Sequence, residues 1–391
     1  MTGTSTVTRH APGKLFIVGE YAVVQPGHPA IVAAVDRRVT VTASAAHGAE
    51  AHGAQAHGGG GGADVVIDSD LCPGGARLRR GDGGLAPLGA DDEQRVRDGL
   101  THVVSAIEVV DGLLAEQGLS APPVHLSISS SLHHEGTKLG LGSSGAVTVA
   151  SVSAVAAYYG LELSDEDRFR LAMLATARLD ARSSGGDLAA SVWGGWIEYR
   201  APDRAAVLDL VQRRGIEESL RTPWPRFGLR RLPSPRGLAV EVGWTGRPAS
   251  TASLVGSLGR RAWQDSASQR SFLERSDTCV RASVDALERG DGPELLRQVR
   301  GARRMLAELD EEVRLGIFTP TLSALCDAAE TVGGAGKPSG AGGGDCGIAL
   351  LDATADDATV HEQISRLRKG WAAAGVLPVP IHLQSTKGSA A

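Results

Sequence analysis

The chain has 391 residues, a formal net charge of −5 and 42% hydrophobic residues. This length predicts two domains more readily than one. The sequence has no basic field and no stretch with the apolar length of a membrane span, so we expect neither nucleic acid nor a membrane as a partner. The N-terminus has no signal-peptide core, and the four scattered cysteines predict reduced thiols in a cytoplasmic protein.

Short strands separated by turns dominate the first part of the chain. Strands are expected at 6–10, 30–35, 38–43 and 64–68, with a turn followed by an apolar strand within 11–24. Residues 45–63 carry three histidines among alanine and glycine. A histidine tract can bind metal, but so much glycine cannot hold a fixed ligand geometry, so we expect a disordered loop. Residues 74–92 predict another loose connection.

Helical patterns follow. Residues 93–118 place six apolar residues, from Val96 to Leu114, on one stripe. After a strand at 124–128, the helix expected at 144–159 is apolar nearly all round, which predicts burial between layers. Ser164, with three acids behind it, predicts the start of the next helix.

Residues 138–146 form a glycine-rich loop between the strand at 124–128 and the buried helix. Such a loop points backbone N–H groups at one spot, where the helix N-terminus adds about half a positive charge. Many such loops only connect elements, and the two best-known phosphate-loop patterns do not fit. The paired Ser143 and Ser144 favour an anion site, because one hydroxyl can cap the helix while the other contacts a phosphate oxygen or Mg²⁺.

Asp187 is a single acid among small residues, after Gly185 and Gly186 and ahead of a strand predicted at 193–199. The small neighbours leave room for a ligand. The alternative is a helix N-cap, which Ser183 or Ser184 could supply equally well. The sequence therefore favours a functional carboxylate.

A proline-rich stretch at 222–235 predicts a domain boundary, and we divide the chain into 1–225 and 226–391. The second half predicts strands at 237–244 and 376–383, a glycine-rich loop at 339–347 running into a strand, and helices at 250–263, 268–289, 293–313, 321–331 and 359–374. This is the pattern of a helix-rich α+β domain. Glycine-rich loops in both halves predict one cleft lined from both sides.

Lysine is scarce, since only five of the 40 basic residues are lysines. Three of them, Lys14, Lys138 and Lys337, lie in glycine-rich stretches. Chance and solubility are the plain explanation, but a compact cation suits a phosphate as a point charge. The distribution favours lysines kept for phosphate chemistry.

Three motifs, at 12–24, 140–146 and 339–350, together resemble the GHMP kinases, the superfamily of galactokinase, homoserine kinase, mevalonate kinase and phosphomevalonate kinase. The resemblance covers essentially the whole chain. Residues 19–23, Lys138 before the loop and Asp345 in the third motif are similar to the phosphomevalonate kinases. Mevalonate kinases tend to have a histidine in place of Tyr21 and a small residue in place of Asp345.

The resemblance implies an α+β fold of two domains, the first like ribosomal protein S5 domain 2 and the second ferredoxin-like. It implies ATP-dependent phosphorylation of (R)-5-phosphomevalonate to the 5-diphosphate, a step of isoprenoid synthesis, with ATP and Mg²⁺ as cofactors. The ATP-binding residues that it implies are Lys138, Gly140, Leu141, Gly142, Ser143, Ser144, Gly145 and Ala146, with Ser144 on the metal.

The segment 186–189 resembles the one that carries the catalytic aspartate of the family, here Asp187. Lys14 is expected to bridge the acceptor and the transferred group, and Asp187 to orient Lys14. Lys138, Arg182 and Lys337 are candidate extra cations for the acceptor phosphate. The residues expected around the acceptor are Lys14, Arg182, Ser183, Gly186, Asp187, Ser339, Gly340, Ala341 and Gly342.

One departure from the family concerns the metal. Several members place a magnesium-binding glutamate on the helix before the catalytic aspartate, but residues 171–179 contain no acid. The carboxylate partner of Mg²⁺ stays open, as does the choice between monomer and homodimer. Mevalonate kinase, with an alcohol acceptor, and a non-catalytic ligand sensor of the same fold are the alternatives.

Overall fold

A computed structural model describes residues 6–46, 63–70, 72–249, 254, 256 and 263–385. The loop expected at 45–63 and the helix expected at 250–263 lie largely outside these residues. None of the described helices is long and apolar enough to cross a membrane.

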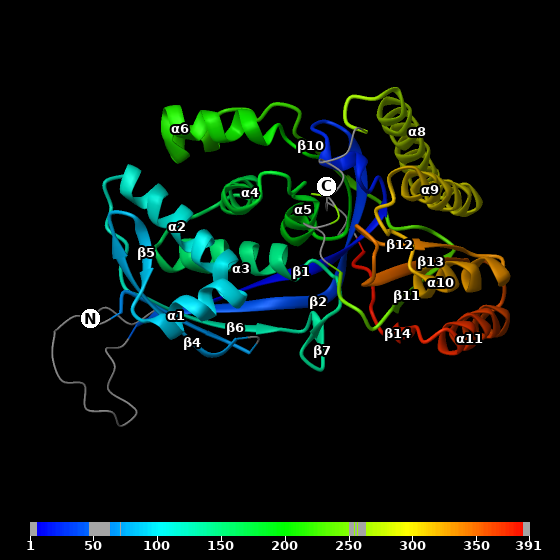
Figure 1. Ribbon diagram of the computed structural model, residues 1–391, viewed down its shortest axis with the longest axis horizontal. Coiled ribbons are helices and arrows are strands. Elements are labelled where there is room, and N and C mark those ends of the chain that lie inside the picture. Colours follow the sequence, from blue (N-terminus) through cyan, green and yellow to red (C-terminus); the bar gives the residue numbers. More distant parts are fainter. Residues whose placement is uncertain are drawn as a thin grey trace.

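The first half of the chain builds one large sheet and a group of helices beside it (Figure 1). The strands follow the order β10-β9-β2-β6-β3-β4-β5, and β1 pairs with β2. Their bounds are β1 Val7–Val18, β2 Pro29–Ala45, β3 Val65–Ser69, β4 Cys72–Gly81, β5 Gly84–Pro87, β6 Val124–Ser130, β9 Trp196–Arg200 and β10 Gly228–Leu232. A small hairpin, β7 (His133–His134) and β8 (Thr137–Lys138), precedes the first glycine-rich loop.

The prediction of a turn after residue 10 is wrong, because β1 runs without interruption from Val7 to Val18. Its partner β2 is likewise one strand rather than two. Gly13 lies at an irregularity in the pairing, where a Cβ would come within 2.6 Å of Leu132 Cδ2 and 2.7 Å of the Leu141 carbonyl oxygen. Glycine therefore serves close packing within the strand rather than a turn, which sequence pattern alone cannot distinguish.

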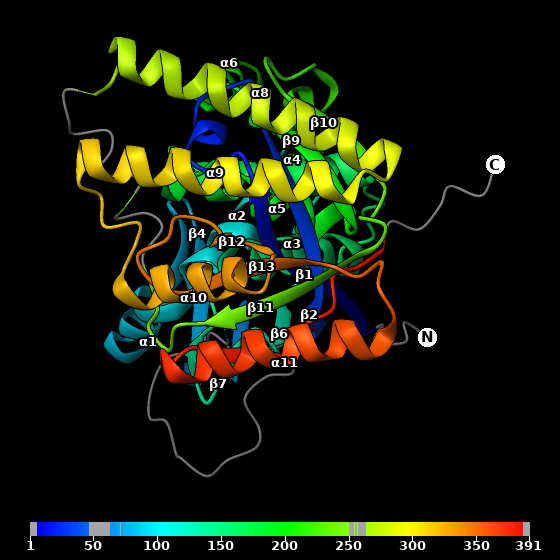
Figure 2. The same ribbon diagram turned by 90° about the vertical axis from the view of Figure 1, so that its right-hand side faces the viewer.

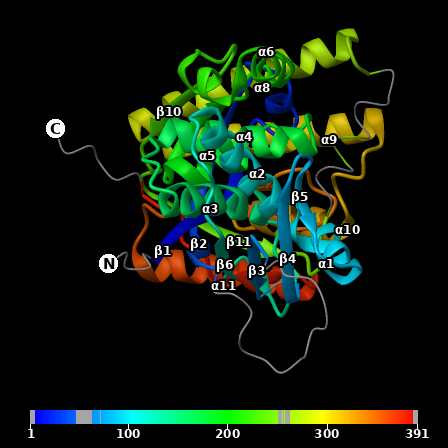
Figure 3. The same cartoon turned by 90° about the vertical axis from the view of Figure 1, so that its left-hand side faces the viewer.

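Residues 74–92, expected as a loose connection, form the hairpin β4–β5 and lead into α1 (Ala90–Arg95). Four residues of β4 are buried, namely Cys72, Gly75, Ala76 and Leu78. Because Gly75 and Ala76 are consecutive, the buried positions do not alternate regularly, and the pattern among glycines and arginines is too weak to predict a strand. Figure 3 shows β3, β4 and β5 beside α1 and α2 at this end of the molecule.

The predicted helices of the first half are confirmed, with shifts at their ends. The stripe at 93–118 becomes α1, a turn of π-helix (Val96–Leu100) and α2. Ser164 accepts a hydrogen bond from the Asp167 N–H and completes a capping box, as its position predicted. The bounds are α2 Thr101–Glu116, α3 Ser143–Tyr158, α4 Asp165–Leu179, α5 Gly186–Trp193 and α6 Arg204–Arg221.

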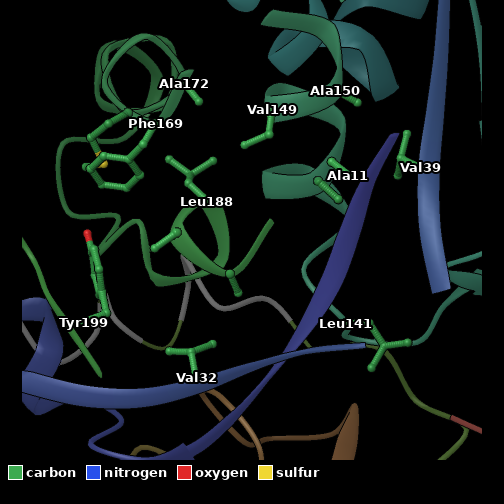
Figure 4. Packing of buried hydrophobic residues seen from close by; sticks show 14 of the residues in the cluster. Ala11, Val32, Val39, Leu141, Val149, Ala150, Phe169, Ala172, Leu188 and Tyr199 are labelled. Carbon is green, nitrogen blue, oxygen red and sulfur yellow. The ribbon is translucent and has the colours of Figure 1, made fainter. Parts of the chain in front are cut away.

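The main core lies between these helices and the sheet. Figure 4 shows Val149 and Ala150 of α3, Leu188 of α5 and Phe169 of α4 in this core, with Phe169 near Tyr199 of β9. The helix α3 is buried along most of its length, as its uniformly apolar sequence predicted. Packing on several sides fixes the position of its N-terminus relative to β1.

The second half forms a four-stranded antiparallel sheet in the order β12-β13-β11-β14. With the helices between strands, this order is that of a ferredoxin-like domain, as expected. Figure 2 shows α8, α9, α10 and α11 at this side of the molecule. The bounds are β11 Leu238–Trp244, α8 Ala267–Arg289, α9 Gly292–Val313, α10 Pro320–Thr331, β12 Ala335–Pro338, β13 Cys346–Asp352, α11 Asp357–Ala373 and β14 Leu377–Val379.

The two halves are joined at more than one place. The large sheet extends into the proline-rich stretch, because β10 ends at Leu232, and the second sheet begins after that stretch with β11. The end of the described chain returns to the first half, where Leu383 makes a bridge to Val35. The division at 225 and 226 stays a prediction.

Candidate active site

The first glycine-rich loop presents the open N-terminus of α3. Gly142, with φ 76°, is the N-cap residue, and no side chain caps the helix. The expectation that a serine hydroxyl caps α3 is therefore wrong: Ser143 and Ser144 lie in its first turn. The first N–H groups of a helix have no partners within the helix, and together with the dipole they favour an anion.

Lys14, on β1, lies against this loop. Its side chain is 7% exposed, and Nζ donates to the Gly140 carbonyl oxygen at 3.1 Å. Its backbone N–H donates to the Leu141 carbonyl at 2.8 Å, which fixes the loop to the strand. Nζ also lies 5.5 Å from the centre of the Phe16 ring. Strand and loop together hold one cation beside the N-terminus of α3.

Asp187 lies in the first turn of α5, and Gly185 rather than Asp187 is the N-cap residue of that helix. The alternative of a capping role is thereby excluded. Oδ1 accepts from the Leu188 N–H at 3.0 Å. A Cβ on Gly145 would lie 2.4 Å from Oδ2, so the carboxylate points at the first turn of α3.

Lys14 and Asp187 flank the same glycine. A Cβ on Gly142 would lie 2.9 Å from Lys14 Cγ and 3.3 Å from Asp187 Cβ. Glycine at this position satisfies both the positive φ and the close approach. The structure thus brings a cation, a carboxylate and the amides of a helix N-terminus to one place.

The second glycine-rich loop reaches this place from the other half. A Cβ on Gly340 would lie 3.6 Å from Lys14 Nζ. Ser339 is 4% exposed; its hydroxyl accepts from the Phe16 N–H at 2.9 Å and donates to the Phe16 carbonyl at 3.1 Å. The Tyr21 hydroxyl donates to the Ala341 carbonyl at 2.5 Å. Ser339 and Tyr21 therefore tie the loop to β1 and the turn after it.

Comparison with known sequences shows the family of this chain. The family profile described as "GHMP kinases N terminal domain" matches residues 102–195, and "GHMP kinases C terminal" matches 283–372. A phosphomevalonate kinase from Streptomyces sp. (strain CL190) is 60% identical over 380 residues, covering 97% of this chain and 98% of that protein. The chain belongs to the GHMP kinases.

Two further similar GHMP kinases are named for different acceptor substrates. A solved structure of Streptococcus pneumoniae phosphomevalonate kinase in complex with phosphomevalonate and AMPPNP has a TM-score of 0.78 at 26% identity, covering 97% of this chain and all of that one. A mevalonate kinase from Thermococcus onnurineus (strain NA1) is 29% identical and covers 88% of this chain and 89% of its own length.

The remaining expected site residues of this GHMP kinase differ in how exposed they are to solvent. Lys138 is exposed at the end of β8. Arg182 is exposed and donates to Asp180 Oδ1 at 2.9 Å, and it approaches the second half, because a Cβ on Gly256 would lie 2.6 Å from its Nη1. Gly186 lies beneath Phe16, and Ser183 is half-buried before α5.

Lys337 does not fit the prediction of a cation for the acceptor phosphate. It is 0% exposed, and its Nζ donates to Glu20 Oε1 and, at 2.6 Å, to the Pro338 carbonyl. Glu20 is itself buried and also accepts from the Gly340 N–H at 3.5 Å. The buried pair therefore stabilises the start of the second glycine-rich loop. The sequence of the motif gave no sign that the side chain of this lysine points into the protein.

Sequence reasoning also missed His102, at the start of α2. Its Nδ1 is buried without a hydrogen-bond partner among the described residues. Burial lowers the pKa of His102, while Asp187 raises it and Lys138 lowers it further. The side chain therefore lies within the electrostatic field of the site, and a single histidine on an apolar stripe carries no signal of that.

Proposed function

We propose that this GHMP kinase transfers the γ-phosphoryl group of ATP to the phosphate of (R)-5-phosphomevalonate, giving (R)-5-diphosphomevalonate in the mevalonate pathway of isoprenoid synthesis. The identity of 60% to a phosphomevalonate kinase over nearly the whole length of both chains carries the proposal. The meeting of Lys14, Asp187 and the N-terminus of α3 supports it.

The main task of such an enzyme is to neutralise charge. The second pKa of the acceptor phosphate is about 6, so this phosphate is mostly dianionic at neutral pH. Two unit charges about 4 Å apart repel by roughly 4 kcal/mol at an effective dielectric constant of about 20. The amides of the loop and of the first turn of α3, at 140–146, hold the phosphates of ATP. Lys14 lies between donor and acceptor and offsets their repulsion.

Asp187 orients Lys14, and its carboxylate accepts any proton left on the acceptor. Because a dianionic acceptor has little need of a base, positioning and charge carry most of the catalysis. Ser339 holds Gly340 over Lys14 through its bonds to Phe16. The second loop then closes the acceptor side of the site.

The residues present suit Mg²⁺ in the way that phosphoryl-transfer sites usually bind it. No group of three or more His, Cys, Asp or Glu side chains in the described parts of the chain could hold a metal ion. Mg²⁺ commonly uses one or two protein oxygens together with substrate phosphates. The Ser144 hydroxyl and Asp187 Oδ2, which points at the turn containing Ser144, are such oxygens. When bound, Mg²⁺ neutralises charge on the ATP phosphates.

Mass spectrometry of the product formed from ATP and 5-phosphomevalonate tests the proposal directly. The expected product carries one additional phosphate on the acceptor phosphate. We expect Lys14→Met and Asp187→Asn to lower kcat at least about 100-fold in folded protein, with the smaller loss for Asp187→Asn if charge outweighs base catalysis. Near-normal turnover by Asp187→Asn would contradict the role of that carboxylate.

Mevalonate kinase is the second candidate, since a relative at 29% identity has that activity by name. A coupled ADP-release assay with mevalonate and phosphomevalonate side by side decides between them. Turnover of ATP with either acceptor excludes a ligand sensor. We place the enzyme in the cytoplasm, and a monomer or homodimer stays the prediction for its assembly.

A further inference from the structure

Tyr21 has a strained backbone conformation in the turn that follows β1. Its φ of 63° and ψ of −44°, together with a hydrogen bond of 2.7 Å from the Ala22 N–H to the Glu20 carbonyl, define a γ-turn of the rare, strained form. A bulky residue with positive φ is an outlier that persists only where the surrounding structure holds it. The strain therefore points to a role for the side chains of this turn.

The turn directs two consecutive side chains at one loop. Glu20 accepts a hydrogen bond from the Gly340 N–H at 3.5 Å, and the Tyr21 hydroxyl donates to the Ala341 carbonyl at 2.5 Å. In an extended strand, neighbouring side chains point to opposite faces, so an extended backbone would turn one of the two away. Adjacent residues of the first half therefore hold adjacent residues of the second glycine-rich loop because the chain turns at Tyr21.

Packing of the Tyr21 ring fixes the place of its hydroxyl. The residue is 5% exposed and shares a hydrophobic cluster with Trp263 and Phe272 of the second half. A tyrosine side chain has only two torsions, so a packed ring leaves its hydroxyl little freedom. Burial raises the pKa of Tyr21, and the charges of Asp310 and Glu20 raise it further, so the hydroxyl keeps its proton and remains a donor.

The hydrogen bond to Ala341 acts on the part of the loop that lies nearest to the cation of the site. Ala341 directly follows Gly340, where a Cβ would lie 3.6 Å from Lys14 Nζ. On either side of this pair, Ser339 and Gly343 are held by hydrogen bonds of their own. The tyrosine hydroxyl therefore fixes the middle of the loop, beside the cation that we place between the reactants.

We propose that Tyr21 is a positioning residue that holds the second glycine-rich loop over the acceptor phosphate through its hydrogen bond to the Ala341 carbonyl. The inference rests on the proposed function, in which this loop closes the acceptor side of the site. The hydroxyl acts on the loop and not on the reactants, so it determines how well phosphomevalonate is bound and oriented. Residues 140–146 hold the ATP phosphates, so the binding of ATP is independent of Tyr21.

Tyr21→Phe removes the hydroxyl and keeps the ring in its hydrophobic cluster. We expect kcat/KM for phosphomevalonate to fall about tenfold, mainly through a higher KM, while the KM for ATP stays within about twofold of wild type. A coupled ADP-release assay measures both constants. A general loosening of the fold would instead change the two KM values together, so a change confined to phosphomevalonate identifies positioning on the acceptor side.

Hydrogen exchange measured by mass spectrometry, in protein without substrates, reports on the loop directly. Peptides that cover residues 339–345 should exchange at least about threefold faster in Tyr21→Phe, because the middle of the loop loses a restraint. Tyr158→Phe is the matched control: its hydroxyl also donates to a backbone carbonyl, that of Pro123 at 3.2 Å, but it lies at the end of α3 opposite the phosphate-binding loop. It should leave both KM values and the exchange of 339–345 unchanged.

A wild-type KM for phosphomevalonate in Tyr21→Phe would overturn the inference. A higher KM with unchanged exchange at 339–345 would also overturn it, because the hydroxyl would then act on the substrate itself and not on the loop. Absence of phosphomevalonate turnover in the unaltered protein would instead overturn the proposed function, and the role in acceptor binding with it. The two failures are distinguishable, because the second is seen in the unaltered protein and the first only in the variant.

Discussion

Gly145→Ala tests the arrangement of the site without removing any of its functional groups. Gly145 lies in the first turn of α3, where alanine favours a helix by about 1 kcal/mol over glycine. The new Cβ would lie 2.4 Å from Asp187 Oδ2 and 2.6 Å from Cγ. Ordinary contact begins near 3.4 Å, so Asp187 or the helix must move by about 1 Å.

A displacement of this size at a reacting centre costs on the order of 100-fold in rate, or about 2.7 kcal/mol of activation free energy. We therefore expect kcat to fall about 100-fold while the melting temperature stays the same or rises slightly. Kinetics in a coupled ADP-release assay and a melting curve measure the two quantities on the same preparation.

Gly301→Ala is the control, because this glycine lies within α9 and the nearest atom to its new Cβ is Arg304 Nη2 at 3.9 Å. It should gain stability and keep its activity. Adding Gly145→Ala to Asp187→Asn should cause little further loss, since both changes act on one carboxylate. A kcat within about threefold of wild type for Gly145→Ala would refute the geometry on which the mechanism rests.

Three other predictions concern buried groups. Lys337→Met should destabilise the fold by about 3–5 kcal/mol, because it leaves Glu20 charged and buried, and adding Glu20→Gln should restore part of this in chemical denaturation. Burial raises the pKa of Cys279 to about 11 and of Cys326 to about 12, so neither should react with iodoacetamide at about pH 8 until the protein unfolds, as mass spectrometry can show. Burial lowers the pKa of His102 below its usual 6.5, so the unfolded chain binds a proton at a higher pH than the folded protein does. The free energy of unfolding should therefore fall as the pH drops below 6.5. In melting curves recorded at several pH values, His102→Gln should show a weaker dependence of the melting temperature on pH.

Local sequence determined the elements whose signals lie within a few neighbouring residues. The capping box at Ser164 and Asp167 set the start of α4, and the apolar run after Gly142 set α3 as a buried helix. The glycine-rich loop could be interpreted as an anion site because a helix N-terminus has the same free amides in any fold. The three motifs in order then led to the family.

Tertiary structure decided which residues meet. Whether Gly13 marks a turn or a close contact depends on Leu132 and Leu141, which are distant in sequence. Lys337 looks like a phosphate ligand in its motif, yet its partner Glu20 lies 317 residues earlier and keeps it inside. The contact of Asp345 with Gly140 likewise joins the two halves. Periodicity and propensity describe one segment at a time, whereas burial and charge pairing depend on what the rest of the chain places opposite each side chain.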